Sequence, residues 1–249
     1  MKRFFIFTNI VLTSLAFLCT GCGKLTNETN TDQEPPNNIP ADALPGVFSV
    51  SNTKKVHFSK GNLYADGDYA LHFESNQYSS ANRWNASHVS HFTWSSSVED
   101  AVSSSNSGIN LFCDESHKVS VDGSKAIYYA LSKDEWTYLF NNHSKKWVSV
   151  NDVNGYVIAP DGFRGELAGR YADDADLAAN NLVFFPAAGY RSGYDINYGD
   201  RGYYWSSSVS DSYYAHRVGF DVDGISPGNR GPRSSGYCVR LVTDVNNRL

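Results

Sequence analysis

The last third of the chain lacks four residue types. Residues 167–249 contain no Lys, Glu, Gln or Met, whereas the preceding 166 residues contain 10 Lys, 7 Glu, 2 Gln and 1 Met. At the same rate about ten such residues would be expected, since an ordinary polar surface uses Lys and Glu freely. The absence argues against an ordinary solvated surface in this region.

Cysteine and positive charge are also limited. The spacing of the four cysteines does not match a metal site, and the formal net charge is −5, which argues against a nucleic-acid partner. Cys113 and Cys238 are the two cysteines of the expected domain, and they either pair or remain two buried thiols. A single Met and 14% aromatic residues favour a strand-rich, turn-rich domain over a helical bundle.

A different set of residues is concentrated between Tyr190 and Cys238. Of these 49 residues, 37 are Ser, Tyr, Gly, Asp, Arg or Asn. Tyr provides a large rigid contact at low entropic cost, and Ser, Gly and Asn adapt their hydrogen bonds. Arg adds a planar fork of donors. The composition predicts an exposed recognition surface.

The genetic code offers one explanation for the missing types. If both adenines of an AAC or AAT codon change, the codon can encode Asn, Asp, Ser, Gly, Tyr, His, Arg and several others. It cannot encode Lys, Glu, Gln, Met or Trp. The alternative is that recognition loops avoid flexible Lys and Glu side chains in any case.

The N-terminus predicts export and lipidation. Lys2 and Arg3 precede an apolar stretch, residues 4–18, of signal-peptide length. The following Leu18–Cys22 resembles a bacterial lipobox, so residues 1–21 are expected to be a signal peptide and Cys22 the lipidated anchor. The alternative is an ordinary cleaved signal peptide. Residues 22–45 are poor in apolar residues and are expected to form a disordered tether.

The domain is expected over residues 46–243, as short strands joined by long loops. The clearest helix starts at Ser132, where Ser132 and Glu135 match a capping box. Trp136, Leu139 and Phe140 then share one helical face. We expect strands at 47–50, 56–59, 61–64, 69–73, 147–150, 156–159, 182–188, 203–207, 215–220 and 237–242, with a turn at 152–155.

Four motifs occur in a characteristic order: Ala130–Trp136, Phe185–Arg191, Tyr204–Ser208 and Gly236–Val242. Together they resemble the C-type lectin-like fold in its formylglycine-generating-enzyme-like form. More closely, they are similar to surface lipoproteins of Bacteroidetes that carry the Fibrobacter major paralogous domain. The resemblance implies an α+β fold with mixed short-strand sheets, one or two helices and long loops. It also implies an outer-membrane lipoprotein exposed at the cell surface.

Some proteins with this C-terminal pattern are variable proteins of diversity-generating retroelements. The resemblance implies a variable region at 189–240 that binds an extracellular protein or glycan. Trp205, Ser206, Ser207 and Arg240 are the expected scaffold. The expected ligand-binding positions, to which Gly219 also belongs, are Ser192, Tyr194, Asp195, Asn197, Tyr198, Asp200, Arg201, Asp211, Ser212, Tyr213, His216, Arg217, Asp221, Asp223, Asn229, Arg230, Ser234 and Ser235.

The alternation between Ala215 and Val222 supports this division. Val218, Phe220 and Val222 are expected to point inward, and Arg217, Gly219 and Asp221 outward. His216 is expected to be exposed at the start of the strand.

Rival chemistries find little support. The sequence lacks the calcium-binding triplets of C-type lectins, and the acidic residues Asp173, Asp174 and Asp176 favour a solvated loop over a calcium site. No nucleophile, base and orienting group occur together, and His88 and His91 are expected at the surface. We therefore expect no enzymatic activity, cofactor or metal. The alternative functions are a metal-independent glycan adhesin, with tyrosine rings stacked on sugars, and a fimbrial or structural envelope subunit.

Overall fold

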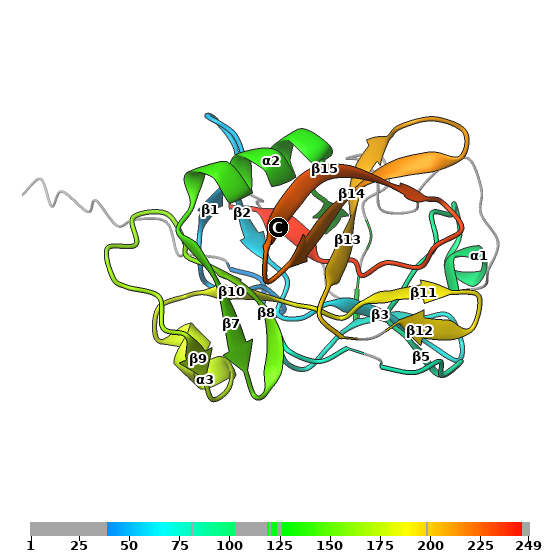
Figure 1. Cartoon of the computed structure of the whole chain (residues 1–249), viewed down its shortest axis with the longest axis horizontal. Helices are drawn as coiled ribbons and strands as arrows, with labels where there is room; N and C mark the ends of the chain where they lie inside the picture. The colour runs from blue at the N-terminus through cyan, green and yellow to red at the C-terminus, as the bar shows by residue number, and fades with distance from the viewer. Residues whose placement is uncertain are drawn as a thin grey trace, which may run out of the picture. The chain divides into compact units, whose positions relative to one another are not determined.

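The structure is a computed structural model that describes residues 39–80, 82–102, 119, 121–123, 126–197 and 199–245. The predicted signal peptide, the anchor Cys22, Cys113 and Tyr198 lie outside the described residues. A compact unit takes in Asn38–Leu249. Its described part is a strand-rich mixed fold with three helices, which agrees with an α+β class (Figure 1).

The helices are short and the strands are numerous. The helices are α1 (Val98–Val102), α2 (Lys133–Asn142) and α3 (Asp174–Ala178). The strands are β1 (Phe48–Ser49), β2 (Lys55–Phe58), β3 (Leu63–Asp66), β4 (Leu71–Phe73), β5 (His88–Val89), β6 (Tyr129–Ala130), β7 (Lys145–Val150), β8 (Val153–Ile158), β9 (Arg170–Tyr171), β10 (Val183–Pro186), β11 (Tyr190–Ser192), β12 (Asp195–Asn197), β13 (Gly202–Val209), β14 (Tyr214–Asp221), β15 (Gly224–Pro232) and β16 (Leu241–Asp244).

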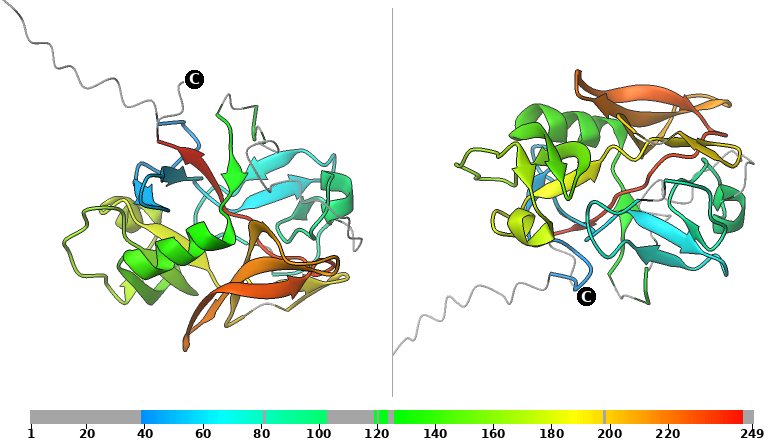
Figure 2. Two further views of the ribbon diagram at one scale, coloured as in Figure 1. Left: turned by 90° about the horizontal axis from the view of Figure 1, so that it is seen from above. Right: turned by 60° about the horizontal axis from the view of Figure 1, so that its bottom comes forward.

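These strands form five small sheets, as the expectation of mixed short-strand sheets implies. Their orders are β1-β2-β16-β6, β10-β8-β7-β9, β4-β3-β5, β11-β12 and β13-β14-β15. The last strand, β16, lies between β2 and β6, so the C-terminal end of the chain closes the sheet that the N-terminal hairpin begins. In both views of Figure 2 the β13–β15 sheet lies at the periphery of the domain, beside α2.

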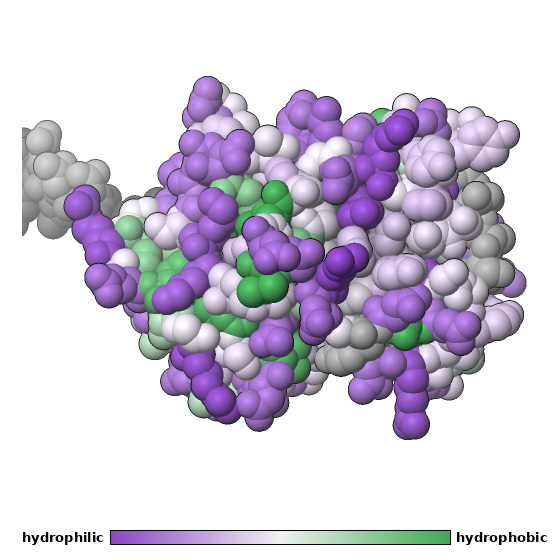
Figure 3. Space-filling model, viewed as in Figure 1, coloured by the Kyte–Doolittle hydropathy of each residue, from purple (hydrophilic) through white to green (hydrophobic). Residues whose placement is uncertain are grey.

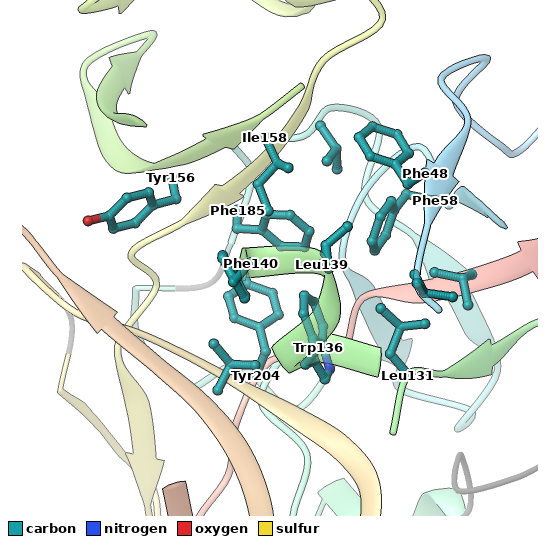
Figure 4. Packing of buried hydrophobic residues seen from close by; sticks show 14 of the residues in the cluster. Phe48, Phe58, Leu131, Trp136, Leu139, Phe140, Tyr156, Ile158, Phe185 and Tyr204 are labelled. Carbon is teal, nitrogen blue, oxygen red and sulfur yellow. The ribbon is translucent and has the colours of Figure 1, made fainter. Parts of the chain in front are cut away.

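Helix α2 begins as predicted. The Ser132 hydroxyl accepts a hydrogen bond from the Glu135 amide at 3.2 Å, and a Glu135 carboxylate oxygen accepts one from the Ser132 amide at 2.7 Å. These reciprocal bonds satisfy two amides that the first turn would otherwise leave free. Trp136, Leu139 and Phe140 are buried and pack toward Phe185, as Figure 4 shows. This apolar face fixes α2 on the core.

Several elements differ from the sequence prediction. The last strand, expected at 237–242, is β16 at Leu241–Asp244. The β7–β8 turn lies at Asn151 and Asp152, whose φ angles of 47° and 63° give the positive-φ pair of a tight hairpin, and not at 152–155. Residues from the predicted tether pack on the domain: the Leu44 amide donates to the Phe58 carbonyl at 2.7 Å. Strand β15 was not predicted, because Gly224–Pro232 contains three glycines and two prolines.

The prediction that His91 lies at the surface is wrong. Its side chain is fully buried, and Nε2 lies 2.9 Å from the Ala188 carbonyl oxygen. Burial lowers the pKa of His91 to about 4, so the ring is neutral at pH 7 and donates its Nε2 proton to that carbonyl. His88 is half-buried, with Nε2 2.7 Å from a Glu74 carboxylate oxygen that raises its pKa. Both histidines therefore serve the fold.

Candidate functional site

The β13–β14–β15 sheet has one packed face and one partly open face. Tyr204 pairs with Val218 in register, and both side chains are buried against the core that α2 covers. On the opposite face Tyr203 pairs with Gly219, and Trp205 pairs with Arg217. Because paired residues share a face, the sheet presents Tyr203 and Arg217 away from α2.

The predicted scaffold residues are held by specific contacts. The Trp205 indole is buried and donates to the Phe92 carbonyl at 2.7 Å. The Ser206 hydroxyl donates to the His216 carbonyl at 2.8 Å, which ties β13 to β14, and the Ser207 amide donates to the Leu131 carbonyl at 2.8 Å. These bonds fix β13 to its neighbours on both sides.

Arg240 is the charged residue of the predicted scaffold, and its side chain is buried. Its guanidinium donates to Gln77 Oε1 at 3.1 Å, and burial lowers its pKa to about 10. At pH 7 the Arg240 guanidinium is therefore still charged. Because it is buried and donates to Gln77, we assign it a structural role.

Sequence reasoning missed the role of Arg191. Its guanidinium is buried and donates to the carbonyls of His91, Gly193 and Ala101 at 3.0, 2.9 and 3.2 Å. Gly193 lies in the turn between β11 and β12, so Arg191 anchors the hairpin that carries Ser192, Tyr194, Asp195 and Asn197. An arginine in an otherwise apolar run, Phe185–Arg191, was the available signal.

Of the described residues predicted to contact a ligand, Gly219 alone is buried. Tyr194 and Tyr213 are 66% and 74% exposed. His216 and Arg217 are partly exposed, and a His216 ring nitrogen lies 3.1 Å from the Gly228 carbonyl oxygen, so His216 is less exposed than predicted. The others, exposed or partly buried, are Ser192, Asp195, Asn197, Asp200, Arg201, Asp211, Ser212, Asp221, Asp223, Asn229, Arg230, Ser234 and Ser235.

One predicted orientation is also wrong. Val222 is 63% exposed, because β14 ends at Asp221 and Val222 lies in the hairpin turn that follows. Gly219 lies on the same face as Tyr203, as the alternation predicts, but Arg217 covers it, so it is buried.

A cavity of about 420 Å³ lies on the partly open face. Six predicted positions line it: Arg201, Arg217, Gly219, Asp221, Asp223 and Asn229. Tyr203 also lines it. This cavity is the candidate functional site.

Arg217 lies at the cavity wall against two aromatic rings. Its guanidinium carbon lies 4.4 Å from the Tyr203 ring centroid and 5.3 Å from that of Tyr237. Only glycine leaves room for it at position 219, since a Cβ there would lie 2.3 Å from Nη1. Within the described residues Arg217 makes no ion pair, whereas the nearby Arg201 lies 3.5 Å from a carboxylate oxygen of Asp221.

The other predicted positions gather elsewhere. At the opposite end of β14, Arg230 lies 3.4 Å from Asp211 and 5.2 Å above the Tyr214 ring. Tyr194, near the β11–β12 turn, contacts Trp84 edge to face at 5.1 Å. In Figure 3 the surface over β11–β14 is mostly pale to purple, as a mixture of Tyr, Ser, Gly and charged residues would be. The predicted positions are thus divided between this cavity and two aromatic groups.

The acidic cluster is part of a helix cap. Asp173 accepts bonds from the Ala175 and Asp176 amides at the start of α3, and Asp176 accepts one from the Ala172 amide. Asp174 accepts a bond from the Gln77 amide. These hydrogen bonds explain the positions of the three carboxylates, and a bound ion is not needed to explain them.

Comparison with known proteins gives one match. A family model described as a domain of unknown function (DUF8237) matches residues 173–242. No curated protein and no solved structure matches the chain. The matched segment runs from α3 into β16, so it contains the whole of the candidate site. No helix in the described residues is long and apolar enough to cross a membrane.

Proposed function

We propose that the chain is a cell-surface lipoprotein that binds an extracellular ligand through the partly open face of the β13–β14–β15 sheet and does no covalent chemistry. The observation that carries the proposal is the separation of roles along β13 and β14. The predicted scaffold side chain Trp205 is buried, whereas Arg201, Arg217 and Asp221 line a cavity that opens on the surface. A framework of this kind holds polar side chains in place for recognition.

The proposal extends to the anchor and to the fold family. Cys22 would carry the lipid, and the chain would be displayed at the outer membrane as a C-type lectin-like variable protein. Diversification by a retroelement is consistent with the exposure of the predicted variable positions and with the burial of Trp205, which an Asn codon cannot reach by adenine changes.

Binding by matched variants tests this function. The full chain in detergent would be applied to arrays of glycans and of extracellular proteins, and each ligand found would be measured against two variants. The face variant changes Arg201, Arg217, Asp221, Asp223 and Asn229 to Ala. The control variant changes the same charge types at exposed positions outside the predicted contact set: Lys145, Arg164, Asp68, Glu166 and Asn180.

We expect the face variant to lose about 100-fold or more in affinity, since a few central residues carry most of the energy of an interface. The control variant should bind like the unchanged chain, and both should keep its melting temperature within a few degrees. A ligand that still binds the face variant but no longer binds the control variant would contradict the proposal.

A further inference from the structure

The cavity on the β13–β14–β15 face has a lining of mixed charge. Arg201 and Arg217 contribute two positive charges, Asp221 and Asp223 two negative charges, and Asn229 an uncharged amide. Such a lining offers donors for one anionic group and acceptors for several hydroxyl groups. Its volume of about 420 Å³ lies within the range of small-molecule sites, ~300–1,000 Å³.

The guanidinium of Arg217 is the feature that selects an anion. Nε and Nη1 are shielded from solvent and make no hydrogen bond to the described residues. Asp221, the carboxylate on the same strand, lies within ion-pair distance of Arg201. The positive charge of Arg217 is thus held at the cavity wall beside two aromatic rings, where a ligand carboxylate would be attracted more strongly than in bulk water.

The two aspartates decide which anionic ligand fits. A stretch of acidic peptide would bring further carboxylates toward Asp221 and Asp223. Repulsion between these like charges would disfavour binding. A sugar with a single carboxylate has hydroxyl groups that donate to those aspartates and to the Asn229 amide oxygen. Ring stacking is not the mode of binding here, because the guanidinium of Arg217 already lies against the Tyr203 ring.

We propose that the cavity binds a sugar unit that carries a carboxylate, with the carboxylate beside Arg217 and the hydroxyl groups on Asp221, Asp223 and Asn229. This assignment rests on the proposed function of the face and specifies its ligand class.

The test uses the full chain in detergent with free monosaccharides as probes. Glucuronic acid, galacturonic acid and N-acetylneuraminic acid would be compared with glucose and galactose by ligand-observed NMR titration. We expect binding of at least one acidic sugar in the millimolar range and at least tenfold weaker binding of the neutral sugars. In Arg217→Gln the affinity for that acidic sugar should fall at least tenfold, which corresponds to about 1.4 kcal/mol.

Two further variants separate loss of the site from loss of the fold. Gly219→Ala keeps the charge but displaces the guanidinium, so it should also weaken binding of the acidic sugar. Arg170→Gln removes an exposed positive charge outside the cavity and should leave the affinity unchanged. Melting temperatures of all three variants would be measured in parallel.

The outcomes distinguish the two proposals. Equal binding of acidic and neutral sugars, or an affinity unchanged in Arg217→Gln, would overturn the acidic-sugar assignment. Binding of a poly-glutamate peptide, lost in Arg217→Gln, with no sugar bound would also overturn it, but would leave the recognition face intact. Ligand binding that survives the five-position face variant would defeat the proposed function itself.

Discussion

Trp205→Ala is expected to lower the free energy of unfolding by about 3–5 kcal/mol, the usual cost of removing a large buried aromatic side chain. The Trp205 ring contacts Trp94 at 5.3 Å and Tyr237 at 4.4 Å between centroids, and its indole N–H bonds to the Phe92 carbonyl. The substitution leaves a cavity between these rings and removes the indole hydrogen bond, although the Phe92 carbonyl still accepts one from the Tyr237 amide. For a domain of this size the melting temperature should fall by roughly 10 °C.

Two control variants identify the cause. Trp205→Phe keeps one aromatic ring but loses the hydrogen bond and part of the buried volume, so it should cost less, about 2 kcal/mol. Tyr213→Ala removes an aromatic ring that is 74% exposed and should change stability by no more than about 0.5 kcal/mol. Calorimetry or chemical denaturation checks all three. Equal costs for Trp205→Ala and Tyr213→Ala would show that the two rings do not differ in role.

Acidification from pH 6.5 to pH 4 is expected to cost about 3 kcal/mol of stability through His91 alone. Burial lowers its pKa to about 4, against about 6.5 in the unfolded chain. Between these values the unfolded state binds a proton that the folded state excludes, so stability decreases as the pH falls. Below pH 4 His91 is protonated in both states, so its destabilising effect is complete and the curve flattens.

A second histidine acts with the opposite sign and in a different pH window. The hydrogen bond to Glu74 raises the pKa of His88, so its contribution is complete below about pH 6.5 and is lost as the pH rises through the folded value. Urea denaturation at intervals between pH 4 and 8 measures the free energy of unfolding as a function of pH. His91→Gln should remove most of the decrease in stability toward acidic pH, and His88→Gln only the decrease toward alkaline pH. If His91→Gln left the acidic decrease unchanged, the assigned burial of His91 would be contradicted.

Local signals in the sequence were enough to predict the elements with strong short-range determinants. The Ser132–Glu135 capping box and the spacing of Trp136, Leu139 and Phe140 specify α2 without reference to the rest of the chain, and the structure confirms them. The apolar run at 182–188 likewise becomes the buried strand β10. In both cases the side chains that form the sequence pattern are also the side chains that are buried.

Contacts between distant segments could not be predicted in this way. Strand β15 contains glycines and prolines that argue against a strand, yet it pairs with β14 along most of its length because tertiary packing outweighs local propensity. The burial of His91 depends on Ala188, 97 residues away, and that of Arg191 on Ala101. No local pattern specifies such partners.

The candidate site was predictable as a set of exposed residues but not as a cavity. Composition and the alternation along β14 identified Arg217 and Asp221 as accessible positions, and both line the site. The stacking of Arg217 on Tyr203 and the need for glycine at 219 depend on the pairing of β13 with β14 and could be seen only in three dimensions.

The most direct test of the account is a stability-sorted library of the full chain. Each predicted contact position and each of the scaffold residues Trp205, Ser206, Ser207 and Arg240 would be replaced by all twenty amino acids, and folded variants counted by protease resistance. We predict that most replacements at the contact positions retain the fold, while most at the scaffold positions lose it. Equal tolerance at the two sets, or lower tolerance at the contact positions, would contradict the claim that a rigid framework carries a replaceable recognition face.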